Sequence, residues 1–136
     1  MGKIKAYCRI GCPHSDNTRT VLNNLKSSDS TLKISVISVE NNESKKTEIK
    51  NNLRSIIGNH NTFPIIIYKR SKGKKYLVGG NSDLEGIMNI YHSISNLTDE
   101  ENIQKLCSYG RGGISKGCFH MLLYLMLKRD RRVGTI

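Results

Sequence analysis

The sequence predicts an α/β fold in which a four-stranded mixed sheet carries helices on both faces, with a helical C-terminal extension. Three observations lead to this prediction. Strand-like and helix-like segments alternate through the first part of the chain, which is typical of βαβ units. The last two strand-like segments are separated only by a turn around Gly73, which predicts a hairpin. The continuous apolar run 63–68 indicates a strand that is covered on both faces.

The individual elements follow from hydrophobic periodicity and from residues that favour caps and turns. Pro13 is typical of a first helical turn, because its missing N–H costs nothing there. Ser44 is expected to cap the second helix, and Gly58 is expected to end it. In chain order, the predicted elements are a strand over 3–7, a helix over 13–27, a strand over 32–39, a helix over 44–57, a strand over 63–68, a strand over 76–78 and a helix over 81–95.

The character of the sequence changes after Asn96, so we divide the chain into a domain over 1–95 and a basic extension over 96–136. A short helix is expected to reach about Cys107, and a glycine-rich stretch follows. The apolar run 119–127 is too short to span a membrane, which takes about 20 residues. It can pack on the domain, lie at a membrane surface or bind a partner, and packing is the favoured interpretation.

The cysteine content indicates the redox compartment of the protein, whereas the net charge does not identify a binding partner. The formal net charge is +11, and five of the seven residues over 69–75 are basic. A basic surface attracts nucleic acid, anionic membranes and acidic substrates alike. Four unevenly spaced cysteines do not form a disulfide scaffold, and no secretory signal is visible. We therefore expect a reducing, cytoplasmic setting.

Cys12 is the strongest candidate for a reactive group. It follows a strand and a turn and directly precedes Pro13, which places it at the N-terminus of a helix. The free N–H groups and the dipole there favour a thiolate over a thiol. Arg9 adds a nearby positive charge. A cysteine packed in the core as a small hydrophobe is the alternative, but the whole pattern favours reactivity.

Three motifs in residues 1–95 resemble the glutaredoxin family, in the same order and at the same spacing. They are Cys12-Pro13-His14-Ser15, Thr62-Phe63-Pro64 and Gly79-Gly80-Asn81-Ser82-Asp83-Leu84. The resemblance implies a thioredoxin-like fold, a nucleophile at Cys12 and a cis peptide bond before Pro64. It also implies glutathione as the co-substrate.

The same resemblance implies a glutathione site around Cys12. The backbone of Phe63 would pair with the glutathione backbone like an added strand. The N–H groups of Asn81 and Ser82, with the Ser82 and Asp83 side chains, would hold its γ-glutamyl end. Arg9, where the family usually has Lys, would bind the glycine carboxylate. The implied glutathione-binding residues are Arg9, His14, Thr62, Phe63, Pro64, Gly80, Asn81, Ser82 and Asp83.

Two positions depart from the family's commonest tetrad. Ser15 stands where a second cysteine is usual, so Cys12 has no resolving thiol in the tetrad. Cys8 could substitute, but at a strand end it is expected to point into the core. His14 stands where an aromatic ring is usual, and it either tunes the thiolate or replaces the ring in packing. These residues favour a monomeric enzyme that reduces glutathione mixed disulfides, including glutathionylated proteins, by a monothiol mechanism.

Two alternative functions stay open. A tetrad ending in serine also resembles single-cysteine glutaredoxins, in which a dimer holds a [2Fe–2S] cluster through two cysteine thiolates and two glutathione thiolates. Cys12 would then be the ligand from this chain. The second alternative is a binding module that uses the basic segment 69–75 and the basic C-terminus to contact nucleic acid or an anionic surface.

Overall fold

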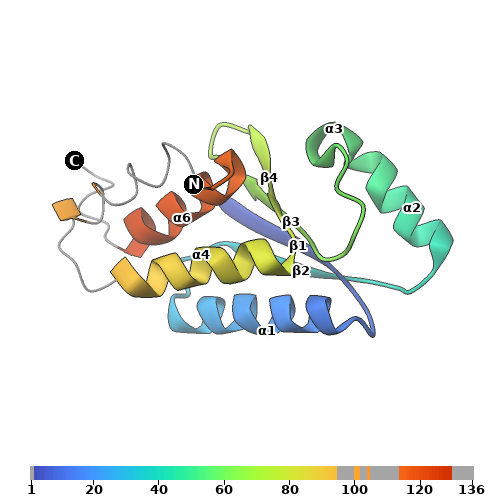
Figure 1. Cartoon of the computed structure of the whole chain (residues 1–136), viewed down its shortest axis with the longest axis horizontal. Helices are drawn as coiled ribbons and strands as arrows, with labels where there is room; N and C mark the ends of the chain where they lie inside the picture. The colour runs from blue at the N-terminus through green and yellow to red at the C-terminus, as the bar shows by residue number, and fades with distance from the viewer. Residues whose placement is uncertain (1, 95–99, 102–103, 105–113, 130–136) are drawn as a thin grey trace.

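A computed structural model describes residues 2–94, 100–101, 104 and 114–129 and contains one mixed sheet (Figure 1). Its strands are β1 (Lys3–Arg9), β2 (Ile34–Val39), β3 (Ile65–Lys69) and β4 (Lys75–Gly79). The order across the sheet is β2-β1-β3-β4. β1 runs parallel to β2 and antiparallel to β3, and β3 and β4 form the expected hairpin. With helices on both faces, this topology confirms the predicted thioredoxin-like α/β fold.

One face of the sheet carries the main core. It is covered by α1 (Pro13–Ser28), α4 (Asn81–Ile94) and α6 (Lys116–Arg129), which lie together on one side of the sheet in Figure 1. Alternate β1 residues face this side because successive strand side chains point to opposite faces. The side chains of this core with the least exposure include Ile4, Ala6, Leu22, Ile66, Leu84, Ile87, Met121, Leu122 and Leu125.

The opposite face is covered only in part, by α2 (Glu43–Asn52) and α3 (Arg54–Ile57). Its smaller cluster consists of buried Val39, Ile57, Phe63, Ile65 and Ile67 with partly buried neighbours. No residue of α2 is buried, so this helix lies along the cluster without sealing it. The end of β1 nearest Lys3 is therefore left open on this face.

α6 belongs to the main core and is not a separate appendage. A Cβ atom added at Gly117 would collide with the backbone of Leu77, so only glycine allows α6 to approach β4 this closely. Cys118 donates its S–H to the carbonyl oxygen of Val78 at 3.3 Å. Packing was the favoured interpretation of the run 119–127, and the burial of Met121, Leu122 and Leu125 confirms it. The division at residue 95 lies among residues that the structure does not describe, and it stays a prediction.

Within the described ranges, no helix is long and apolar enough to cross a membrane. The short helix expected to reach Cys107 falls largely on residues that the structure does not describe.

Two details of the predicted helices are wrong. The second helix is capped by Asn42, whose side-chain oxygen accepts from the Lys45 backbone N–H at 3.2 Å, and not by Ser44. It is also two helices, because the backbone of Leu53 leaves helical geometry with φ −103° and ψ 4°. Gly58 ends the second of them with a positive φ of 56°, as its position predicted. Most strand bounds also shift by one or two residues.

Candidate active site

Three segments of the candidate site meet at one end of the sheet. The register pairs Tyr7 of β1 with Ile65 of β3, and Ile66 of β3 with Gly79 of β4. The carboxyl end of β1, the amino end of β3 and the carboxyl end of β4 therefore lie side by side. This arrangement brings the loop to Cys12, the Phe63–Pro64 bond and the Gly79–Gly80 turn to the same end of the sheet.

Cys12 is the N-cap residue of α1, with extended backbone angles of φ −105° and ψ 122°. Pro13 takes the first helical position, and the Cys12 carbonyl oxygen accepts the first helical hydrogen bond from the Asp16 N–H at 2.8 Å. Gly11 makes the preceding turn at φ 80°, a conformation that other residues rarely adopt. Strand, turn and proline thus place the sulfur where the first N–H groups of the helix lack intrahelical partners.

The surroundings lower the pKa of the Cys12 thiol from its ordinary value. The largest cause is the backbone N–H of Ser15, which favours the thiolate even though the side chain makes no capping hydrogen bond of standard geometry. Burial opposes this effect, since Cys12 is only 6% exposed. The Arg9 guanidinium, the Ser15 hydroxyl and the His14 backbone N–H lower the pKa further. A thiolate is the nucleophilic form of cysteine, so the site favours sulfur chemistry.

Ser15 is part of the framework of this site. Its side chain is fully buried, and its hydroxyl oxygen accepts from the Arg9 backbone N–H at 2.9 Å. This hydrogen bond fastens the end of β1 to the first turn of α1. Sequence reasoning treated Ser15 only as a missing cysteine and did not foresee this contact. No sequence signal marks it, because it depends on how the turn folds back.

Pro64 follows a cis peptide bond, as the family resemblance implied. Phe63 is buried, Thr62 is exposed, and the Lys50 ammonium lies 5.6 Å from the Phe63 ring centroid. His60 was missed by sequence reasoning. Its Nε2 atom lies 3.3 Å from the Pro64 carbonyl oxygen, and its ring flanks the space beside Gly80. His60 thus joins the Phe63–Pro64 segment to the start of α4.

The predicted γ-glutamyl subsite lies at the N-terminus of α4. Gly79 has φ 132°, and any Cβ there would collide with the Asp83 carboxylate. That carboxylate accepts from the Gly80 N–H at 2.9 Å, directly before α4 begins at Asn81, which is the predicted first residue of the helix. The Asn81 side-chain oxygen accepts from Asn17 Nδ2 at 2.8 Å and from Thr18 Oγ1 at 3.0 Å. The Asn81 side chain is therefore committed to holding α4 against α1, whereas Ser82 is exposed.

The predicted residues thus form two groups. Arg9, Cys12, His14 and Ser15 are linked around the sulfur, and Pro64 and Gly80 lie beside one another. Among the residues that the structure describes, no cluster of three or more His, Cys, Asp or Glu side chains could hold a metal ion.

The sequence matches no family model and no curated protein. Among solved structures, the chain is similar to the NMR structure of reduced glutaredoxin from Escherichia coli. The two share 16% sequence identity with a TM-score of 0.45, over 62% of this chain and 89% of the other. Strand order and register define the fold of this chain.

Proposed function

We propose that this protein is a glutathione-dependent thiol–disulfide oxidoreductase that reduces glutathione mixed disulfides through Cys12. The observation that carries the proposal is the lowered pKa of Cys12 at the N-terminus of α1. The sulfur also lies at the sheet end that carries a cis-proline segment and a second helix N-terminus. A thiolate can attack a disulfide. The unpaired backbone N–H groups at a helix N-terminus can bind the carboxylate of a thiol substrate beside it.

The reaction proceeds in two exchange steps. In the first, the Cys12 thiolate attacks the glutathione sulfur of a mixed disulfide. A bond forms between Cys12 and glutathione, the original disulfide bond breaks, and the substrate leaves as a thiolate that takes up a proton. In the second, the thiolate of another glutathione molecule attacks the glutathione sulfur bound to Cys12. This step gives oxidised glutathione and returns Cys12 as a thiolate stabilised by the Ser15 N–H and by Arg9.

Glutathione would bind between the two helix N-termini. The Phe63 backbone can pair with its peptide backbone. Asn81 and Ser82 can offer their N–H groups to the γ-glutamyl carboxylate, and the Asp83 oxygen that does not bond to Gly80 can accept from the α-amino group. Arg9, already beside the sulfur, can bind the glycine carboxylate. These roles stay proposals, as do those of His14, Thr62 and Gly80.

The chemistry is proposed to use one thiol. Ser15 occupies the tetrad position of a resolving cysteine and is engaged with the backbone of Arg9. Cys8 is fully buried, and burial raises the pKa of its thiol. It is therefore poorly placed to resolve a disulfide at Cys12. The expected partners are glutathione and glutathionylated proteins, and the expected setting is a reducing cytoplasm in which glutathione is available.

Turnover of a small glutathione mixed disulfide tests the proposal. We expect Cys12→Ser to lower the rate at least 100-fold, to the uncatalysed background, because a serine hydroxyl cannot carry the exchange. Cys8→Ala is the matched control, since it removes a thiol four residues away without touching the site, and it should keep most of the activity. Comparable turnover by Cys12→Ser and wild type would overturn the proposal.

Binding of a [2Fe–2S] cluster is the alternative that the same thiolate supports. Because the described residues hold no cluster of potential ligands, this chain would supply only Cys12. A second copy of the chain and two glutathione thiols would have to complete the four sulfur ligands. Anaerobic purification with glutathione distinguishes the two functions. A brown dimer with visible absorption supports the cluster, and a colourless active monomer supports the enzyme.

A further inference from the structure

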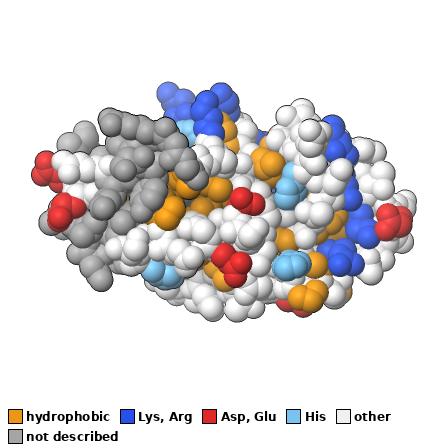
Figure 2. All heavy atoms as spheres, in the orientation of Figure 1, with side chains coloured by type: hydrophobic (Ala, Val, Ile, Leu, Met, Phe, Trp, Pro, Cys, Tyr) orange, Lys and Arg blue, Asp and Glu red, His pale blue; other side chains and the backbone are white. Residues whose placement is uncertain are grey.

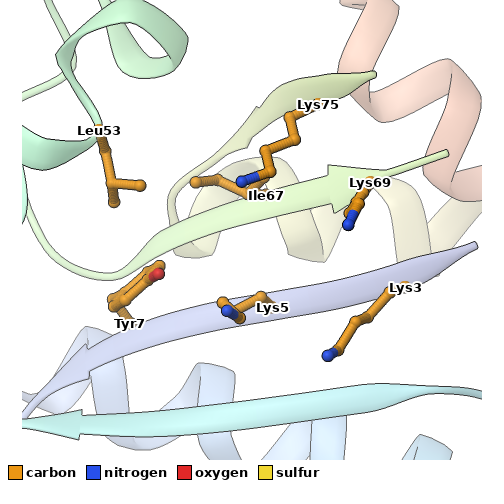
Figure 3. Close-up of a pocket in the computed structure, with 7 residues that line it drawn as sticks. All are labelled: Lys3, Lys5, Tyr7, Leu53, Ile67, Lys69 and Lys75. Atoms are coloured by element: carbon orange, nitrogen blue, oxygen red, sulfur yellow. The ribbon is translucent and has the colours of Figure 1, made fainter. Parts of the chain in front are cut away.

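The open part of the second sheet face forms a hollow lined by lysines (Figure 3). It has a volume of about 100 Å³ and lies at the end of the sheet that α2 and α3 leave uncovered. Four lysines from three adjacent strands surround it, together with apolar and aromatic side chains, and its lining contains no carboxylate. The lining residues are Lys3, Lys5, Tyr7, Leu53, Ile67, Lys69 and Lys75.

The strand register places three of these lysines in one row. Lys3 pairs directly with Lys69, and Lys69 pairs directly with Lys75. Like charges at directly opposite positions of neighbouring strands destabilise a sheet. Neither ion pair found in the described ranges, Arg19–Asp16 or Lys46–Glu43, involves a lysine of this row. The fold thus accepts a local repulsion that a bound anion would relieve.

This positive region is larger than one phosphate group requires. Neighbouring strands lie roughly 4.8 Å apart, so the row spans about 10 Å, and Lys5 lies about 7 Å further along β1. The β3–β4 turn carries further basic residues, but Arg70 and Lys74 lie against Tyr76 on the α6 side of the sheet and do not extend this row. Figure 2 shows Lys and Arg side chains gathered over this turn on the face of the molecule that carries α4 and α6. A continuous surface of this length suits a chain of phosphates better than a single anion.

We propose that this lysine-lined face binds single-stranded nucleic acid. The phosphates of the nucleic-acid strand would lie along Lys3, Lys5, Lys69 and Lys75. One of its bases would lie against Tyr7 and Ile67 on the floor of the hollow. Grooves that bind single strands without sequence preference combine cationic side chains with an aromatic surface on which bases stack. An acidic peptide would use the charges but leave this floor without a partner. The site is on the opposite side of the sheet from α1 and does not involve Cys12.

Fluorescence anisotropy with a labelled 12-nucleotide oligothymidylate tests the proposal on the full chain. The double variant Lys3→Gln/Lys69→Gln is compared with Lys26→Gln/Lys45→Gln, which removes the same charge from exposed positions of α1 and α2. We expect the first variant to bind roughly tenfold more weakly at low salt and to flatten the slope of log affinity against log salt by about 1.4. The control variant should stay within about threefold of wild type, since its lysines lie outside the hollow.

Equal losses of affinity in the two double variants would contradict the proposed binding site, because binding would then depend on net charge alone. A strand of the same length without bases should bind more weakly than oligothymidylate, and equal binding would overturn the contact with the floor. Oligoglutamate of equal charge should compete poorly, and equal competition would overturn the choice of nucleic acid. Binding is expected to be unchanged in Cys12→Ser, so failure here is separate from failure of the proposed enzyme activity.

Discussion

Cys12 and Cys8 lie four residues apart and are both buried, but their surroundings shift the pKa of the thiol in opposite directions. Cys12 caps a helix, and backbone N–H groups and Arg9 lower the pKa of its thiol. Cys8 is in β1 and faces the main core, where burial raises the pKa of its thiol. Arg19 acts to lower the pKa of Cys8 but does not outweigh the loss of solvent. The fold therefore lowers the pKa of one buried thiol by supplying hydrogen-bond donors, whereas burial dominates at the other.

Cys118 extends this comparison to a distant part of the chain. Its thiol is also buried and has a raised pKa, and it donates to the Val78 carbonyl oxygen. Cys8, Cys12 and Cys118 are all free of disulfides. The difference among the three thus comes from position alone, whereas Cys107 is not among the described residues.

The largest expected contrast is the rate of alkylation. Near neutral pH, iodoacetamide should modify Cys12 about 100-fold faster than Cys8 or Cys118, because the thiolate is the reacting form. The pKa of the Cys12 thiol is lowered, whereas burial raises the pKa of the other two. Mass spectrometry of peptides after timed quenching gives the rate at each site. Alkylation in a denaturant is the control, since it should bring the rates close together. Similar rates at Cys8 and Cys12 in the native protein would contradict the contrast.

The free energy of unfolding should be more sensitive to substitution of Cys8 than to substitution of Cys12. Cys8→Ser should lower the free energy of unfolding by roughly 1–3 kcal/mol, because it buries a hydroxyl in an apolar core. Cys12→Ser should be neutral or stabilise by up to about 1 kcal/mol at pH 6, because serine is a preferred helix cap. Urea unfolding of both variants measures this, and equal losses would show that Cys12 is as much a core residue as Cys8.

The pH dependence of the same measurement tests the thiolate. Because folding lowers the pKa of Cys12, the thiolate stabilises the fold fully above the ordinary thiol pKa of about 8.5. This contribution is lost as the pH falls through the lowered pKa. Wild type should therefore gain stability relative to Cys12→Ser between pH 6 and pH 9, and a constant difference would contradict the lowered pKa.

Local patterns in the sequence were sufficient for the fold and for the location of Cys12. Pro13 set the start of α1, and the apolar run 63–68 predicted a strand buried on both faces. Contacts between distant segments were not predictable. Ser15 binds the Arg9 backbone and His60 flanks Gly80 only because the chain folds back on itself.

The row of lysines shows the same limit. The sequence shows that these lysines are present, but only strand pairing places Lys3, Lys69 and Lys75 opposite one another.

The error in the predicted cap of α2 has a local cause. Asn42 and Ser44 are both good caps, and periodicity does not distinguish starts that lie two residues apart.

The smallest expected effect is on the pKa of Cys12 itself. Ser15→Ala removes a hydroxyl that favours the thiolate but keeps the backbone N–H, which is the largest cause of the lowered pKa. The midpoint of Cys12 alkylation against pH should therefore rise by less than about one unit, which is a rate loss below about tenfold at pH values under the midpoint. The part-buried Arg9 N–H would also lose its acceptor, so thermal unfolding must show that the variant is folded under the assay conditions. A midpoint that returned fully to the ordinary thiol value would assign the effect to the hydroxyl and not to the helix N-terminus.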